Sequence, residues 1–239
     1  MMRKQNESLY HGWSSQGETN ELSKTLMGIY RLLLKHFGPR HWWPGESAFE
    51  VMVGAILTQN TSWANVEKAI KNLNSEKLLN PRKLAAVRLK KLEKLVRPSG
   101  YYRQKATRLK IFLDFFLSPP IKGSIRNMKK IETSRLRGML LSVKGIGPET
   151  ADSILLYALD KPVFVVDAYT SRIFSRLGLV DGKISYEDLR GFFTKNLARD
   201  VPLFKDYHAQ LVALGKEYCR KQLRCSLCPL LGISECKNK

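Results

Sequence analysis

The sequence predicts an all-α protein. Apolar residues recur at helical spacing through most of the chain, and residues that start or stop helices bound the segments they mark. One stretch, 163–166, is apolar and β-branched enough to look like a strand, but it is too short to define a sheet. We find no internal repeat and no low-complexity segment.

Local signals place the helix ends. Gly38-Pro39 stops the first helix, Ser47 is expected to cap the second, and Pro148 suits the first turn of a later one, where its missing N–H costs nothing. Asp167 is expected to cap the helix that follows it. In chain order, the predicted helices span 22–37, 48–59, 63–73, 81–87, 89–96, 101–117, 134–142, 148–159, 168–177, 186–197 and 205–219.

The charge of the chain is strongly positive. The 239 residues include 41 Lys and Arg but only 21 Asp and Glu, which gives a formal net charge of +20. Hydrophobic residues make up 44% of the chain, which suffices for a core. The length fits one large or two small domains. A protein this basic most often binds a polyanion, so we expect nucleic acid and salt-sensitive binding.

The sequence predicts no membrane segment. No apolar run is long enough to span a bilayer, and we expect no membrane partner. Residues 1–20 are polar and lack the apolar core of a signal peptide, so they are expected to form a flexible leader. We therefore expect an intracellular, cytoplasmic protein.

The stretch from Val143 to Asp152 is the most informative part of the chain. Gly145 and Gly147 form a turn between two helices, where a backbone without side chains can come close to another group. The N-terminus of the following helix favours a phosphate, and Lys144 is expected to contact one. Asp167 comes too late in the chain to bind that phosphate, so a role in the chemical reaction is indicated for its carboxylate.

All four cysteines lie near the C-terminus, with the spacing C-x5-C-x2-C-x7-C: Cys219, Cys225, Cys228 and Cys236. In a reducing compartment, such a group indicates a metal rather than disulfides. Four thiolates hold either zinc or an iron–sulfur cluster, and spacing alone hardly separates the two. Pro229 and the compact loop favour a [4Fe–4S] cluster over zinc, with a structural role.

Together, the glycine turn, Asp167 and the cysteine loop resemble the helix-hairpin-helix DNA glycosylases of the endonuclease III superfamily, from Leu22 to Cys236. The resemblance implies two α-helical domains, one spanning 47–162 with the hairpin and the other combining 21–46 with 163–239. It implies a monomer that binds double-stranded DNA containing a damaged base, for base excision repair. The cysteine spacing departs slightly from that of endonuclease III.

Glu149 indicates which members of this superfamily the chain resembles. Bifunctional members have a lysine at this position, which forms a Schiff base and cleaves the strand. A carboxylate cannot form an imine, so the resemblance implies a monofunctional enzyme without AP-lyase activity.

The same change occurs in the 3-methyladenine DNA glycosylase III branch. That branch is also similar in Trp42-Trp43-Pro44, in the segment 57–61 with Trp63, in Lys-Gly-Ile-Gly at 144–147, and in the segment 97–102. Members described as lacking the cluster differ from this chain, which has the four cysteines.

The resemblance and the residues together suggest roles in removing a base. Such an enzyme flips its target out of the stack, and Gln59 has the family's wedge position. Trp42, Trp43 and Trp63, with Pro44, could hold a cationic alkylated purine such as 3-methyladenine or 7-methylguanine by cation–π attraction, or else pack at a domain seam.

Two carboxylates belong to the predicted site. Asp167 can stabilise an oxocarbenium-like sugar and activate water, besides capping its helix. Glu149 is expected to line the pocket, either by favouring a cationic base or by forming hydrogen bonds. Tyr169 and His208 are lesser pocket candidates, and a structural role suits each of them better.

Two alternatives stay open at this point. One is a glycosylase for oxidised bases, which the missing lysine opposes, or for mismatched bases, which the short C-terminal end opposes. The other is a helix-hairpin-helix DNA-binding protein without catalysis, which Asp167 and the tryptophans oppose.

Overall fold

The computed structural model describes residues 21–40, 42–220, 222, 224–232 and 236, so the predicted leader lies outside the described residues. Across these ranges the chain forms helices and no strand, which confirms the all-α prediction. The α-helices are α2 (Glu21–Phe37), α3 (Ala48–Leu57), α4 (Trp63–Ser75), α5 (Pro81–Ala86), α6 (Leu89–Leu95), α7 (Tyr102–Leu117), α8 (Ile125–Lys130), α9 (Thr133–Leu141), α10 (Pro148–Ser153), α11 (Ala168–Arg176), α12 (Tyr186–Asn196) and α13 (Val201–Glu217). Short turns add η1 (Arg97–Ser99), the π-helical η2 (Ile154–Ala158) and η3 (Cys225–Leu227).

The predicted caps are confirmed at two helices. The side chain of Ser47 accepts a hydrogen bond from the Glu50 N–H at 3.2 Å, and Asp167 caps α11. Two predictions were wrong. The α8 helix was missed, because six residues are too few to show periodicity. The last long helix starts earlier than predicted, because Asp200 caps it and Pro202 fits its first turn. The segment 163–166 is a buried connection without strand pairing among the described residues.

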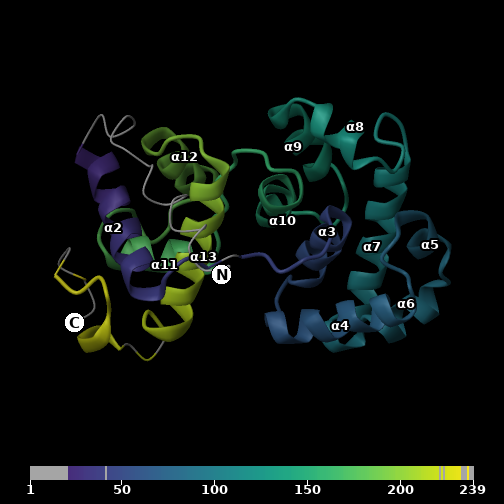
Figure 1. Cartoon of the computed structure of the whole chain (residues 1–239), viewed down its shortest axis with the longest axis horizontal. Helices are drawn as coiled ribbons and strands as arrows, with labels where there is room; N and C mark the ends of the chain where they lie inside the picture. The colour runs from purple at the N-terminus through teal and green to yellow at the C-terminus, as the bar shows by residue number, and fades with distance from the viewer. Residues whose placement is uncertain (1–20, 41, 221, 223, 233–235, 237–239) are drawn as a thin grey trace, which may run out of the picture.

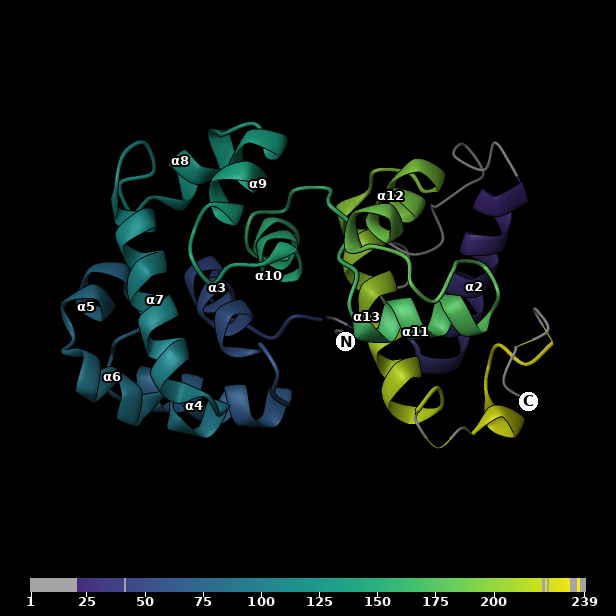
Figure 2. The ribbon, with the colours of Figure 1, turned by 180° about the vertical axis from the view of Figure 1, so that it is seen from behind.

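The helices form two groups (Figure 1). Helices α3 to α10 lie on one side, and α2, α11, α12 and α13 lie on the other, an arrangement that the view from behind repeats (Figure 2). The chain passes between the groups in the segments 38–40, 42–47 and 159–167. The first group is therefore continuous in sequence and the second combines segments from both ends; the domain boundaries themselves stay a prediction.

Each group contains its own cluster of stacked aromatic rings. In the first, Phe112 and Phe116 stack at a centroid distance of 5.9 Å, and Phe49 of the almost completely buried α3 stacks on Phe116. In the second, Phe164 and Phe193 stack at 4.1 Å. Both clusters belong to one buried hydrophobic core that extends through the two groups and fixes the walls of the cleft between them. Along the described stretches, no helix combines the length and the apolar character that crossing a membrane requires.

Candidate active site

The glycine turn joins α9 to α10, as predicted, and its two glycines serve different purposes. Gly145 has a φ of +93°, and a Cβ there would lie 2.6 Å from Cγ of Arg108. Gly147 has an extended φ of −90°, and no described atom lies within 4 Å of where its Cβ would be. The first glycine is thus required by the backbone and by Arg108, whereas the second leaves open space before α10.

The turn forms part of a cleft of about 1040 Å³. Both helix groups contribute to it: α3, α4, α7 and α10 from the first, and α11, α12 and α13 from the second. The predicted site residues that line it are Trp42, Trp43, Gln59, Trp63, Gly145, Gly147, Glu149, Asp167, Tyr169 and His208. Among the predicted residues that the structure describes, Pro44 and Lys144 are not part of this lining; both are exposed.

Gln59 is bound to the hairpin. Its Nε2 donates to the carbonyl of Gly145 at 3.0 Å and to Oγ1 of Thr150 at 2.9 Å. Nη1 of Arg108 donates to its Oε1. The sequence did not single out Arg108, because nothing in the local pattern shows that α7 faces the turn. The wedge role of Gln59 stays a prediction.

Three tryptophans form one wall of the cleft. The ring of Trp63 meets that of Trp43 edge-on at 5.2 Å and that of Trp42 at 5.8 Å. Trp43 Nε1 is buried and has no hydrogen-bond partner in the described part of the chain. The Nζ of Lys216 lies 5.4 Å from the centroid of Trp42. The rings therefore pack against one another and also present aromatic surface to the cleft. Their role in holding a cationic base stays a prediction.

Asp167 sits at the start of α11, where its Oδ1 accepts hydrogen bonds from the N–H of Thr170 at 2.8 Å and from its hydroxyl at 2.9 Å. The side chain is 11% exposed, and its Oδ2 lies 3.7 Å from Nε2 of His208. Burial acts to raise the pKa of Asp167, but His208 and the bonds from Thr170 outweigh it and lower that pKa. The cap therefore holds an ionised, rigid carboxylate at the cleft.

Glu149 lies in the first turn of α10 and faces the same cleft. Although solvent reaches its side chain, the surrounding walls desolvate the carboxylate and raise its pKa. The negative charge of Asp167 raises the pKa further, and His208 lowers it. The two carboxylates thus shift in opposite directions, a pattern typical of an acid and a base in one site.

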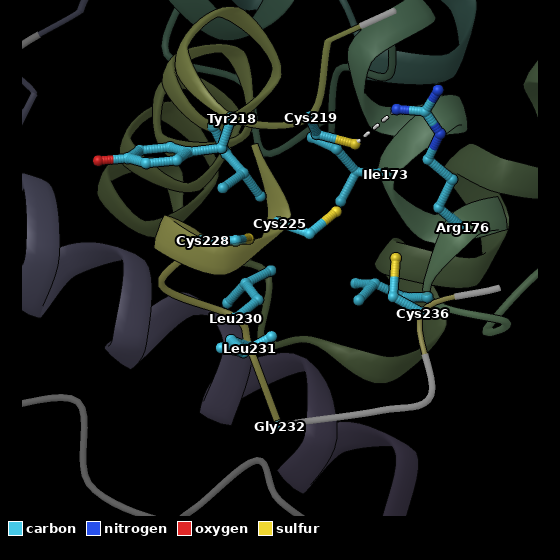
Figure 3. Close-up of a pocket in the computed structure, with 12 residues that line it drawn as sticks. Ile173, Arg176, Tyr218, Cys219, Cys225, Cys228, Leu230, Leu231, Gly232 and Cys236 are labelled. Atoms are coloured by element: carbon cyan, nitrogen blue, oxygen red, sulfur yellow. Dashed lines mark hydrogen bonds between the residues drawn. The ribbon is translucent and has the colours of Figure 1, made fainter. Parts of the chain in front are cut away.

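The four cysteines line a single cavity of about 80 Å³ beside α11 and the end of α13 (Figure 3). They form no disulfide among the described residues. Nη1 of Arg176 donates to Sγ of Cys219 at 3.2 Å, and Leu214 and Leu230 supply apolar walls.

A shared cavity of four thiols fits a four-thiolate group in its donor chemistry. However, the described His, Cys, Asp and Glu side chains form no group of three or more in an arrangement that holds a metal ion.

Comparisons with known proteins agree with this geometry. A family model described as HhH-GPD superfamily base excision DNA repair protein matches residues 53–199. A Methanocaldococcus jannaschii protein that is provisionally named a DNA repair glycosylase is 50% identical over 84% of this chain and 92% of its own length. Endonuclease III of Thermotoga maritima is 30% identical over 81% and 84%.

Solved structures share the fold. H. pylori 3-methyladenine DNA glycosylase (MagIII), bound to 1,N6-ethenoadenine, has a TM-score of 0.71 and 33% identity, over 83% of this chain and 98% of its own. A non-covalent endonuclease III–DNA complex has a TM-score of 0.75 over 90% and 96%, at 23% identity. The hairpin, the cleft and these similarities lead to one conclusion: the chain belongs to the HhH-GPD superfamily of base excision DNA repair proteins and is a DNA glycosylase.

Proposed function

We propose that this glycosylase is monofunctional and releases alkylated purines of the 3-methyladenine and 7-methylguanine type from double-stranded DNA. The observation that carries the proposal is the pair of carboxylates at the cleft, with Glu149 where the bifunctional relatives have lysine. The 33% identity to a 3-methyladenine DNA glycosylase, solved with a modified adenine, supports the substrate class.

The chemistry follows from the residues at the cleft. The damaged nucleotide leaves the helix and enters the cleft, while Gln59 fills the gap in the duplex. A purine methylated at N3 or N7 carries a positive charge that weakens its glycosidic bond. As the C1′–N bond breaks, the base leaves with the bonding electrons. The Asp167 carboxylate stabilises the oxocarbenium-like sugar and takes a proton from the water that attacks C1′.

The tryptophan wall accounts for selection of a cationic base. Aromatic faces attract cations by about 1–2 kcal/mol once water is excluded. Normal bases are neutral and lack this attraction. Glu149 adds a carboxyl group to the cleft, where burial and the charge of Asp167 raise its pKa.

We also propose that Cys219, Cys225, Cys228 and Cys236 hold a [4Fe–4S] cluster rather than zinc. Such a cluster, when bound, supplies a rigid cross-link for the loop after α13 and takes no part in base release. Endonuclease III relatives support this assignment through the shared family. Metal analysis decides it: iron and sulfide in a brown protein support the cluster, and zinc in a colourless one refutes it.

The decisive experiment is base release from methylated DNA, resolved by chromatography. We expect the wild type to release methylated purines and Asp167→Asn to release none, while that variant keeps its affinity for DNA. Full activity of Asp167→Asn would refute the assignment. Borohydride should trap no covalent protein–DNA adduct, and a robust adduct would overturn the monofunctional reading.

The second candidate is a glycosylase for oxidised bases, which the 30% identity to an endonuclease III favours. DNA that contains an oxidised pyrimidine, assayed beside methylated DNA, separates the two candidates. DNA affinity without release of any base would support the non-catalytic alternative. We further propose that the protein acts as a monomer inside the cell, which sedimentation of the free protein and of its DNA complex tests.

A further inference from the structure

Behind Asp167 lies a line of buried side chains from three elements. Tyr157 belongs to the π-helical turn η2, His208 to α13, and Asp167 caps α11. The Tyr157 hydroxyl lies 2.6 Å from Nδ1 of His208, and Nε2 of His208 lies 3.7 Å from Oδ2 of Asp167. His208 is 5% exposed, and its Nε2 has no hydrogen-bond partner among the described residues. A buried nitrogen that has no hydrogen-bond partner and lies near the Asp167 carboxylate needs an explanation.

The Tyr157 hydroxyl can satisfy either form of the imidazole. Burial and the charges of Asp167 and Asp206 hold the pKa of Tyr157 well above its usual value, so the phenol keeps its proton. With neutral His208, the hydroxyl donates to Nδ1 and the ring proton sits on Nε2. With protonated His208, Nδ1–H donates to the hydroxyl, which turns toward the Lys205 carbonyl at 3.3 Å. Either arrangement places an N–H on the side of Asp167.

Other charged groups near His208 do not compete for this N–H. Glu149, from α10, interacts with His208 through charge and makes no hydrogen bond to its Nε2. Asp206 is engaged elsewhere, since its oxygens accept from the Tyr30 hydroxyl, the Arg40 N–H and the Gln210 amide. The separation of 3.7 Å exceeds a hydrogen bond, but a small side-chain rotation closes it, as often happens in catalytic sites when substrate binds.

We infer that His208, oriented by Tyr157, is a positioning residue that keeps Asp167 anionic and leaves any shared proton of the two carboxylates on Glu149. The catalytic consequence rests on the proposed function, because only a glycosidic hydrolysis needs Asp167 as the anion. The ionisation of Asp167 can be measured without any reaction. The imidazole thus decides which carboxylate acts as the base and which donates a hydrogen bond.

Carboxyl ¹³C NMR titration tests the inference, with the Asp167 signal assigned from Asp167→Asn. His208→Leu removes the N–H, His208→Gln retains one, and Tyr157→Phe removes the group that orients the ring. In His208→Leu we expect the Asp167 midpoint to rise by about one to two pH units, the worth of a charge-assisted hydrogen bond. His208→Gln should return the midpoint toward the wild-type value, and Tyr157→Phe should raise it by a smaller amount.

Single-turnover base release from methylated DNA supplies the second readout. The rate of His208→Leu should fall at low pH and recover at high pH, and the ascending limb should follow the NMR midpoint. A loss of rate that is equal at every pH, with an unmoved midpoint, would overturn the inference and leave the proposed function intact. Conversely, a shifted midpoint in a protein whose wild type releases no methylated base would refute the proposed function alone.

Discussion

Arg137 on α9 holds Asp152 on α10 with two hydrogen bonds, from Nε to Oδ1 at 2.6 Å and from Nη2 to Oδ2 at 3.0 Å. Asp152 is fully buried, and the Tyr186 hydroxyl of α12 donates to its Oδ2 at 2.9 Å. Nη2 of Arg137 also donates to Glu187 at 2.6 Å. This ion pair joins the two helices of the hairpin, and its bonds to Tyr186 and Glu187 connect the hairpin to α12 of the second helix group.

Removing Arg137 should destabilise the protein severely. Arg137→Met removes both hydrogen bonds from the cation to the buried Asp152 carboxylate and leaves Arg190, 3.9 Å away, as its remaining ion-pair partner, which we expect to lower the free energy of unfolding by about 3 kcal/mol. The double variant Arg137→Met/Asp152→Leu removes both charges and should regain most of that loss. Urea unfolding of the two variants measures the difference.

Arg135→Met is the matched control for this pair, because Arg135 is exposed on the same helix. It should change the free energy of unfolding by no more than about 0.5 kcal/mol. If the double variant proves as unstable as Arg137→Met, packing rather than the unpaired charge is responsible for the loss.

The sequence predicted the features that depend on neighbouring residues. The Ser47 and Asp167 caps follow from short-range hydrogen bonds, and the hairpin follows from two glycines before a proline. Asp167, Glu149 and the tryptophans were likewise predicted as site residues, and the structure brings them to one cleft.

Contacts between helices could not be predicted in this way. Arg108 meets Gln59 and Gly145 only because α7 packs beside the turn, and no local pattern specifies that packing. His208 occupies an apolar helix face where a structural histidine is the ordinary expectation, and only the position of Tyr157 on η2 shows what the ring is bound to.

Because of Lys105, the stability of the protein should change with pH in the alkaline range. It is 1% exposed, and its Nζ donates to the carbonyls of Leu57 at 2.9 Å and Ser99 at 2.5 Å. Burial and, to a smaller degree, the charge of Arg108 lower the pKa of Lys105 to about 8 from 10.5. Between these values the unfolded chain binds a proton that the folded chain does not, so stability rises with pH across that window.

The size of this effect follows from the shift. The contribution of Lys105 to the free energy of unfolding should increase by about 3 kcal/mol from pH 7 to pH 11. Lys105→Met should abolish that increase, whereas Lys68→Met, at an exposed position on α4, should preserve it. Urea unfolding at several pH values checks this, and an identical pH dependence in Lys105→Met and the wild type would contradict it.

The two hairpin glycines should respond differently to alanine. Gly145→Ala introduces a side chain at positive φ against Arg108 and should lower the free energy of unfolding by about 1–3 kcal/mol. Gly147→Ala meets open space and should change stability by no more than about 0.5 kcal/mol. If the open space before α10 admits a DNA phosphate, Gly147→Ala should nevertheless weaken DNA binding. Unfolding and DNA titration of both variants separate the two effects, and unchanged affinity in Gly147→Ala would exclude a phosphate there.

Lys216 should reduce the preference of the cleft for cationic bases. Its ammonium lies 5.4 Å from the centroid of the Trp42 ring, and both residues line the cleft. Two cations on one ring repel each other, so Lys216→Met should favour a positively charged base over a neutral one. Since a cation–π contact contributes about 1 kcal/mol, we expect the ratio of 7-methylguanine to 1,N6-ethenoadenine release to rise about fivefold. The ratio cancels any general loss of DNA affinity, and Lys216→Arg, which retains the charge, should leave it unchanged. An equal rise in both variants would show that the shape of the side chain, rather than its charge, controls the preference.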